Sequence, residues 1–470
     1  MKITALLLLL SSFVLSQTFK EKYRPQLHFT PPKYWMNDPN GMIYMNGEYH
    51  FWGHAKSKDM VHWEHLPVAL YEEDGIAMWS GTAIQPQDSN NTMVLLYAGM
   101  DRKKGIQTTN VAFSKDNGKT FNKYQNNPVI NPNLRDFRDP KIFYYAPGNY
   151  YVVVVVLSDK SVVRFHKTVD FLTFQIMSEF GPAGAAGGWE CPDVFEMKVS
   201  GTTESKYVVM VSTSGTIGYF VGSFNGTHFS NHQPWIRLDM GTDFYAAQTF
   251  NGLPDQRRVI MGWMCNFGYV GSQPTDPWRG VQTYPRELLL VKNNDSYKIA
   301  SQLVRETHLL VNRTVSHAFH VDVDSEQELT FKDARGRVSV IGVQVELKSD
   351  TKGFGIKVLM SADGSEYTLI DYNVATKKLR IDRSKSGNVD FNENFLKANA
   401  EMEVVPDKDG VVMVDVLVDV SAVEVFANQV AMSAVVFPNA ASSDGLAFVS
   451  HGSSVLKNFV EVDLNSMYDK

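Results

Sequence analysis

Residues 57–63 of the chain read Ser-Lys-Asp-Met-Val-His-Trp, and related segments recur three times further along the sequence. Each copy places an acidic or amide residue a few positions before an aromatic one. The acidic or amide positions 59, 116, 170 and 225 are 57, 54 and 55 residues apart. A period of about 50 residues is typical of a four-stranded propeller blade, so the copies predict a five-bladed β-propeller over residues 25–305. The copies are Ser57-Lys58-Asp59 with Trp63, Ser114-Lys115-Asp116 with Phe121, Lys167-Thr168-Val169-Asp170 with Phe174, and Ser223-Phe224-Asn225 with Phe229.

The rest of the sequence also has the pattern of a β protein. Short runs rich in β-branched residues, such as Val152 to Leu157 and Val411 to Val420, are separated by clusters of Gly, Asn, Asp and Ser. Long helical periodicity is absent from the sequence. After about residue 305 the strand-like runs continue without further carboxylate–proline motifs. We therefore expect an all-β chain in which a C-terminal β-sandwich over residues 315–470 follows the propeller.

Composition excludes several classes of function. The chain has 470 residues, a formal net charge of −6 and 2 Cys. A mildly acidic chain lacks the basic face that binds phosphate backbones, so we expect no nucleic-acid partner. Two cysteines provide neither a disulfide framework nor a multi-cysteine zinc site. Whether Cys191 and Cys265 pair stays open at this stage.

The N-terminus indicates export. Lys2 precedes an apolar run from Ala5 to Leu10, and Val14-Leu15-Ser16 before Gln17 fits a cleavage site. This pattern predicts a signal peptide over residues 1–16 and a secreted, extracellular protein. No later run is apolar enough to span a bilayer, so we expect no membrane anchor. In a secreted chain, Asn-x-Ser/Thr triplets are candidate glycan acceptors, and they begin at Asn90, Asn225, Asn294 and Asn312.

Three carboxylates recur in step with the blades. Asp38 and Asp139 each precede a proline, and Glu190 precedes Cys191-Pro192. Proline is tolerated at the start of a strand, so we expect each acid to begin the first strand of its blade, at the same strand position. Those strands line the central axis of a propeller. The three acids are therefore expected to meet in one cavity, where like charges raise at least one pKa, as a general acid requires. Singly, each has a plainer interpretation as a turn residue, and Asp139 could pair with Arg138.

Aromatic residues lie near these acids. The apolar faces of sugars pack against aromatic rings, so Trp35, Trp79 and Trp189 are candidates for substrate contact, although core packing is the commoner role of tryptophan. His54, His62 and His65 show no metal-ligand spacing. We expect no metal and no organic cofactor.

The motifs together resemble glycoside hydrolase family 32, the invertases and fructan hydrolases. The stretch Trp35-Met36-Asn37-Asp38-Pro39-Asn40-Gly41 is similar to the family's opening motif, and Arg138-Asp139-Pro140 and Glu190-Cys191-Pro192 to its second and third motifs. Further similarities extend the resemblance over nearly the whole mature chain. They include residues 52–55, 59–63, 66–70, 79–81, 243–246, 278–280, 285–288, 419–421 and 423–426.

The resemblance implies a retaining β-fructofuranosidase. Asp38 would be the nucleophile, and Glu190 the acid and then the base, the two carboxyl groups about 5–5.5 Å apart. Asp139, with Arg138, would hold fructose hydroxyls. Further substrate contacts are implied for Trp35, Asn37, Trp79 and Ser80. The expected substrate is sucrose, a fructo-oligosaccharide or a terminal fructosyl unit of a fructan.

One departure from the family concerns the first blade. Family members carry a further segment before the Trp-Gly-His triplet, with a Gln and a Trp that contact the sugar, whereas here Gly47 to Phe51 runs directly into Trp52. The repeat shows the same gap, because Asp38 and Asp59 are 21 residues apart whereas Glu190 and Asn225 are 35 apart. We therefore expect a first blade that lacks one strand and its turn. A real deletion and a misassembled reading frame both remain open.

Three functions are compatible with the sequence. The first is the secreted β-fructofuranosidase. The second is a non-catalytic or weakly active carbohydrate-binding relative, which the shortened blade suggests. The third is a related five-bladed propeller glycosidase of other specificity. Preference between sucrose, inulin and levan, hydrolysis against fructosyl transfer, and oligomeric state are not determined by the sequence.

Overall fold

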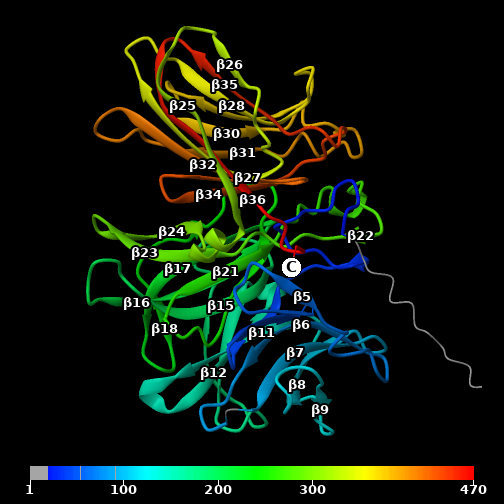
Figure 1. Ribbon diagram of the computed structural model, residues 1–470. Coiled ribbons are helices and arrows are strands. Elements are labelled where there is room, and N and C mark those ends of the chain that lie inside the picture. The colour runs from blue at the N-terminus through cyan, green and yellow to red at the C-terminus, as the bar shows by residue number, and fades with distance from the viewer. Residues whose placement is uncertain (1–18, 53, 90, 470) are drawn as a thin grey trace, which may run out of the picture.

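The computed structural model describes residues 19–52, 54–89 and 91–469, and it is built almost entirely from β-strands (Figure 1). Within these residues, five antiparallel sheets follow one another along the chain and form the β-propeller in the lower part of Figure 1. A β-sandwich of two sheets lies above it. The all-β class, propeller followed by sandwich, is thus confirmed. The predicted signal peptide lies outside the described residues, and no described helix is long and apolar enough to cross a membrane.

Each propeller sheet is an antiparallel meander in which most neighbouring strands are also neighbours in sequence. The first holds β2 (Asn40–Met45), β3 (Glu48–Trp52), β4 (Ala55–Ser57) and β5 (Trp63–His65); the second β6 (Ile76–Ile84), β7 (Met93–Asp101), β8 (Ile106–Ser114), β9 (Asn122–Lys123) and β10 (Ile130–Leu134); the third β11 (Phe137–Tyr145), β12 (Tyr150–Leu157), β13 (Val162–Thr168) and β14 (Gln175–Phe180). The fourth holds β15 (Trp189–Lys198), β16 (Ser205–Thr213), β17 (Thr216–Phe224), β18 (Phe229–Asn231) and β19 (Ile236–Arg237); the fifth β20 (Tyr245–Thr249), β21 (Arg258–Trp263), β23 (Arg286–Asn293) and β24 (Ser296–Leu303). A two-stranded pair joins β1 (Tyr34–Trp35) to β22 (Trp278–Arg279), and short 3₁₀ helices are η1 (Ala146–Gly148), η2 (Ser158–Lys160), η3 (Val270–Ser272) and η4 (Arg305–Leu310).

The recurring sequence segment is a turn that follows the third strand of a blade. Asp59 Oδ1 accepts hydrogen bonds from the backbone N–H groups of Val61 and His62 after β4. Asn225 Oδ1 does the same for Thr227 and His228 after β17. Asp116 and Asp170 make equivalent bonds after β8 and β13. The period in the sequence therefore arises because the first four blades each use one side-chain acceptor to close this turn.

A β-bulge near the beginning of the first strand is common to all five blades. The pairing register shifts between Asn40 and Ile43 in β2, and at equivalent places in β6, β11, β15 and β20. Bulges bend a strand and redirect its side chains, and here they tolerate a proline within β11 and within β15. The bulged stretches are Asn40–Ile43, Met78–Gly81, Arg138–Lys141, Glu190–Asp193 and Tyr245–Gln248.

The bulges correct the expectation that the three acids share one strand position. Arg138 and Glu190 begin their bulges, as Asn40 does in the first blade. Asp139 therefore lies one residue later than Glu190, and Asp38 lies two residues before Asn40, ahead of β2. The acids meet because bulges and a preceding loop direct them to one place, rather than through strict equivalence.

The expectation that the first blade lacks a strand is wrong. Its sheet has four strands in the order β2-β3-β4-β5. The gap has instead shortened the central pair, with five residues in β3 and three in β4 against nine each in β7 and β8. Phe51 pairs directly with Ala55, so the first blade keeps its meander and its strand count.

The sandwich is formed by two six-stranded sheets around a core of aliphatic and aromatic residues. Its proposed start near residue 315 remains a prediction, although the first strand of this part, β25, begins at Val311. One sheet has the order β25 (Val311–Val323), β36 (Ser454–Leu464), β27 (Val338–Leu347), β32 (Val411–Asp419), β33 (Ala422–Ala427) and β34 (Val430–Val435). The other has β26 (Glu328–Phe331), β35 (Gly445–His451), β28 (Gly353–Met360), β29 (Thr368–Asn373), β30 (Lys378–Asp382) and β31 (Ala400–Glu403).

A buried charge cluster joins the two parts. The Arg286 guanidinium on β23 contacts Glu424 of the sandwich at 2.7 Å and Asp239 at 2.7 Å. Glu424 also accepts a hydrogen bond from His28, whose other ring nitrogen is 2.8 Å from Asp419. All five side chains are buried, and such groups hold their charge only when they are paired. These contacts fix the sandwich against the propeller.

Candidate active site

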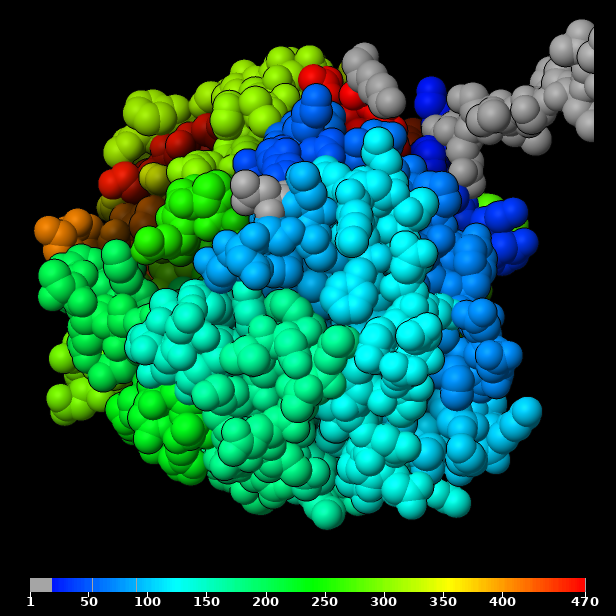
Figure 2. Space-filling model, turned by 90° about the horizontal axis from the view of Figure 1, so that it is seen from below, coloured from blue at the N-terminus to red at the C-terminus, as the bar shows by residue number. Residues whose placement is uncertain are grey.

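The predicted acids line one cavity at the propeller axis. It has a volume of about 510 Å³, and its lining includes Asp38, Asp139 and Glu190. Seen from the propeller end, the blue, cyan and green segments of the blades make up most of the visible surface (Figure 2). The cavity also receives Asn37, Trp79, Ser80 and Arg138 from the predicted substrate-binding set.

Asp38 is held by short contacts from two other blades. Its Oδ2 accepts a hydrogen bond from Ser80 Oγ at 2.6 Å and one from the Cys191 thiol at 3.4 Å. Burial raises the pKa of Asp38 and the charge of Glu190 adds to this, while the hydrogen bonds from Ser80, Asn37 and Cys191 oppose the shift. The loop that carries Asp38 is fixed because β1 pairs with β22.

Gly280 allows this loop to approach β22 closely. A Cβ atom at Gly280 would lie 1.8 Å from the carbonyl oxygen of Met36, and its φ is +101°. Both the contact and the backbone angle therefore demand glycine. Met36 is two positions before Asp38, so the packing at Gly280 sets where that carboxylate lies.

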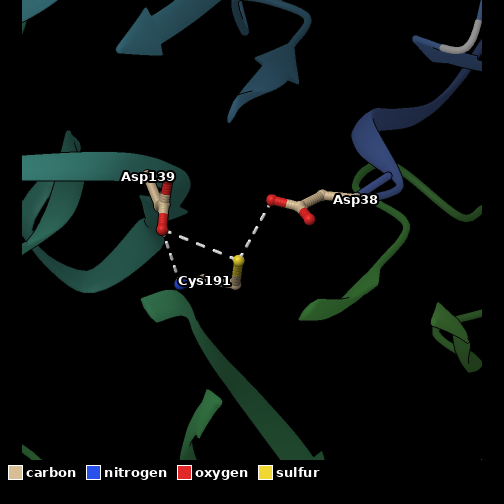
Figure 3. A group of neighbouring side chains, drawn as sticks. All are labelled: Asp38, Asp139 and Cys191. Atoms are coloured by element: carbon tan, nitrogen blue, oxygen red, sulfur yellow. Dashed lines mark hydrogen bonds between the residues drawn. The ribbon is translucent and has the colours of Figure 1, made fainter. Parts of the chain in front are cut away.

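Asp139 and Cys191 meet across the axis from Asp38. The Cys191 backbone N–H donates to Asp139 Oδ2 at 2.9 Å, and its Sγ is 3.6 Å from the same oxygen. The thiol thus lies between two carboxylates (Figure 3). Burial, together with the charges of Asp38 and Glu190, raises the pKa of Asp139 to about 7, although Arg138 and the Cys191 N–H act in the opposite direction.

Both carboxylate oxygens of Glu190 are occupied. Arg138 donates to Oε1 through Nε and Nη2, at 3.1 and 2.9 Å, and the Tyr245 hydroxyl donates to Oε2 at 2.6 Å. Asp136 and Ser158 in turn hold the Arg138 guanidinium. Hydrogen bonds between charged groups are short and directional, so Glu190 is held in one orientation.

Exposed aromatic rings lie in or beside the cavity: Trp79 and Phe267 line it, whereas Trp35 is not a lining residue and contacts two residues that are, Trp263 and Asn37. Trp35 and Trp79 are 48% and 43% exposed, and Phe267 is 58% exposed. Trp35 packs edge-on against Trp263, with ring centroids 5.6 Å apart, and its Nε1 donates to Asn37 Oδ1 at 3.2 Å. A contiguous group of exposed apolar side chains, unlike a single one, often marks a ligand-binding site. By contrast, Trp189 is fully buried in the core, so it does not contact substrate.

The arrangement of Asp38, Asp139 and Cys191 shows whether these residues could hold a metal ion. Ligand atoms of Asp38, Asp139 and Cys191 lie within 4.8 Å of one another. A cysteine ligates as the thiolate, but burial and the neighbouring carboxylates raise the pKa of the Cys191 thiol well above its ordinary value. The donor set therefore does not fit a soft metal. Cys191 and Cys265 are both free thiols, so the two do not pair.

Sequence reasoning gave no role to several residues of the cavity, among them Tyr245, Trp263 and Phe267. Tyr245 lies in a motif that the resemblance covered but was given no role, although it begins the bulge of the fifth blade as Glu190 begins that of the fourth. That equivalence was the available signal. Trp263 and Phe267 carry no motif that marks them. Of the glycan candidates, Asn225, Asn294 and Asn312 are exposed, and Asn90 lies outside the described residues.

Clustered acids in a propeller cavity rimmed by aromatic rings are the arrangement of a carbohydrate-cleaving enzyme. Models of the N-terminal and C-terminal domains of glycosyl hydrolases family 32 match residues 28–302 and 306–465. The chain belongs to this family and is therefore a glycoside hydrolase.

Proteins named for activity on fructans or fructofuranosides are similar to this chain over most of its length. The chain is 37% identical to a levanase of Bacillus subtilis, over 94% of this chain and 70% of that protein. It is 32% identical to an extracellular exo-inulinase of Aspergillus ficuum, over 90% of each chain. The crystal structure of an exo-inulinase from Aspergillus awamori matches with a TM-score of 0.87 and 28% identity, over 96% of this chain and 100% of that one. A fructofuranosidase from Schwanniomyces occidentalis, complexed with fructose, matches with a TM-score of 0.86 and 25% identity, over 95% and 99% of the two chains.

Proposed function

We propose that the protein is a retaining β-fructofuranosidase that releases fructose from sucrose or fructans. The observation that carries the proposal is the convergence of Asp38, Asp139 and Glu190 on one cavity. The levanase and exo-inulinase relatives support the substrate class.

The reaction would proceed in two displacements. In the first, a carboxylate oxygen of Asp38 attacks the anomeric carbon of the fructosyl unit, the bond to the leaving oxygen breaks, and Glu190 gives its proton to that oxygen. In the second, a water oxygen attacks the same carbon and passes a proton to Glu190. The bond to Asp38 then breaks, and both carboxyl groups return to their starting state.

The remaining groups would orient the sugar. The Ser80 and Cys191 hydrogen bonds hold Asp38. Arg138 and Tyr245 hold both oxygens of Glu190. Asp139 would accept hydrogen bonds from fructose hydroxyls, and Trp35 and Trp79 would pack against sugar rings at the mouth. Positioning of this kind lowers the barrier by fixing the reacting atoms in line.

Product analysis with sucrose, inulin and levan tests the proposal. The purified protein is expected to release fructose, and Asp38→Ala and Glu190→Gln to lose about 10²- to 10⁴-fold in kcat. Intact mass spectrometry of Glu190→Gln with substrate is expected to show one fructosyl group bound through Asp38. Binding of fructans without turnover would instead establish the non-catalytic alternative, and turnover of other glycosides alone would establish the third.

Export forms part of the proposal. The relatives from Aspergillus are named extracellular, and the N-terminal segment has the pattern of a signal peptide. Expression in a eukaryotic secretory host, followed by N-terminal sequencing of the protein in the medium, tests cleavage after Ser16. A mass decrease on deglycosylation would show use of the acceptor sites.

A further inference from the structure

A propeller segment lies along the edge strand of the sandwich. β34 is the last strand of its sheet and lies on the side of the sandwich that faces the propeller (Figure 1). The segment 239–243, which leads into β20, runs parallel to it. The backbone N–H of Met240 donates to the Ala431 carbonyl at 2.8 Å, and that of Asp243 donates to the carbonyl of Ser433 at 3.1 Å. These bonds attach the beginning of the fifth blade to the sandwich.

Arg383, which follows β30 of the sandwich, fixes the end of this segment. Its buried guanidinium donates through Nη1 to Asp243 Oδ2 at 3.3 Å and to the Tyr269 hydroxyl at 3.1 Å. The Tyr269 hydroxyl in turn donates to Asp243 at 2.8 Å. Arg383 also donates to the carbonyls of Val435 and Phe395, at 3.1 and 2.7 Å. A buried network whose polar groups bond to one another is rigid, so the sandwich holds Asp243 and Tyr269 together.

Tyr269 belongs to the loop 264–277, which also reaches the cavity. Its ring packs edge-on against Phe395 of the sandwich, with ring centroids 5.2 Å apart. Phe267, two positions earlier, lines the cavity and packs edge-on against Tyr245, with ring centroids 4.9 Å apart. The sandwich therefore also holds the loop from which Phe267 covers the ring of Tyr245.

Tyr245 is thus flanked by two segments that the sandwich holds. It follows Asp243 by two positions, and Phe267 packs on its ring. Its hydroxyl donates to Glu190 Oε2 at 2.6 Å. A shift of either segment would move this hydroxyl away from Glu190, and a displacement of about 1 Å near the reacting atoms can cost about 100-fold in rate.

We propose that Arg383 of the sandwich is a positioning residue for the reaction at Glu190. It acts through Asp243 and Tyr269, which hold the segments on either side of Tyr245. Arg383, Asp243 and Tyr269 are not among the residues that line the cavity, so their effect on turnover passes through the fifth blade. The inference rests on the proposed function and deepens it, because the sandwich then takes part in catalysis by orienting a propeller side chain.

Steady-state kinetics of an arginine variant test the inference. Arg383→Gln is expected to lower kcat by about 10- to 100-fold in protein that near-ultraviolet circular dichroism shows to be folded. KM is expected to change by less than about 3-fold, because Glu190 acts in bond cleavage rather than in ground-state binding. Arg337→Gln is the matched control and is expected to keep the wild-type kcat. This sandwich arginine donates to the carbonyls of Lys22 and Ala440, and neither residue lines the cavity.

A tyrosine variant tests the same contact with a smaller loss of stability. Arg383→Gln leaves Asp243 without its buried cation, which destabilises the fold, whereas Tyr269→Phe keeps the ring and removes only the hydroxyl. Tyr269→Phe is expected to lower kcat by about 3- to 10-fold. The control is Tyr372→Phe, which removes an equally buried hydroxyl that donates to the Val404 carbonyl within the sandwich. It is expected to keep the wild-type kcat.

A double-mutant cycle distinguishes positioning from general loosening of the fold. In the Tyr245→Phe background, Tyr269→Phe is expected to lower kcat by less than about 2-fold, because the hydroxyl that it positions is already absent. Additive losses, or wild-type kcat in folded Tyr269→Phe or Arg383→Gln, overturn the inference and leave the proposed function intact. Absence of turnover of sucrose, inulin and levan by the wild type overturns the proposed function, and the inference with it.

Discussion

His28 is predicted to stabilise the union of propeller and sandwich as a buried cation. Its side chain is fully buried, with Nδ1 2.8 Å from Asp419 and Nε2 3.1 Å from Glu424. Burial alone would lower the pKa of His28. The hydrogen bonds and charges of the two carboxylates outweigh burial and raise the pKa to about 9.

The size and sign of the effect follow from linkage. An unfolded histidine titrates near 6.5, so the native state keeps a proton that the unfolded state loses between pH 6.5 and about 9. A difference of about 2.5 pKa units at 1.36 kcal/mol each gives about 3 kcal/mol. This stabilisation is complete below pH 6.5 and is lost as the pH rises through about 9.

Urea unfolding at pH 6 and pH 10 measures the stabilisation that protonated His28 contributes. The difference in unfolding free energy between wild type and His28→Gln is expected to shrink by about 3 kcal/mol between the two pH values. His308→Gln, at an exposed position, is expected to follow wild type at both. Equal pH dependence in wild type and His28→Gln would refute the reasoning, as would an NMR titration that places the pKa of His28 near 6.5.

Three further predictions concern the active site. Gly280→Ala is expected to lower kcat by at least ten-fold because its Cβ collides with the loop before the nucleophile; Gly271→Ala, which has open space around its Cβ, is the matched control, and equal activities would contradict the packing argument. The pKa of Asp139 is raised to about 7, so ionising this carboxyl disfavours the native state, and wild type is expected to lose stability as the pH rises from about 4 to 7. Asp139→Asn is expected to lack this decrease and to be more stable than wild type at pH 8. Urea unfolding midpoints that change with pH in parallel for the two proteins would contradict the prediction. Tyr245→Phe removes a hydrogen bond to a charged group, worth about 1.5–3 kcal/mol, so kcat/KM is expected to fall about 10- to 100-fold, and a change below 2-fold would exclude a role in holding Glu190.

Local chemistry explains what could be predicted about the fold. The turn acceptors at 59, 116, 170 and 225 each bond to backbone groups two to four residues away, so the requirement lies within a few residues and recurs in the first four blades. The strand count of the first blade was not predictable in this way. A shortened hairpin still pairs when Phe51 can lie opposite Ala55, and that depends on the space left by its neighbours.

In the candidate site, too, residues marked by a local sequence motif were predicted, and residues whose role depends on a tertiary contact were not. The carboxylate motifs marked Asp38, Asp139 and Glu190, because an acid one or two residues before a proline is a feature of neighbours in sequence. Tyr245 had no such mark, since its value lies in a hydroxyl 2.6 Å from Glu190, 55 residues away.

By itself the sequence determined the propeller repeat, the succession of propeller and sandwich, and the choice of three acids as candidates for one site. Tertiary structure decided how these residues act together. It placed the Cys191 thiol between carboxylates from two other blades, buried Trp189 and left Trp79 exposed in the lining of the cavity. The physical reason is that turns and strand beginnings are fixed by neighbours in sequence, whereas cavities and buried charges are fixed by neighbours in space.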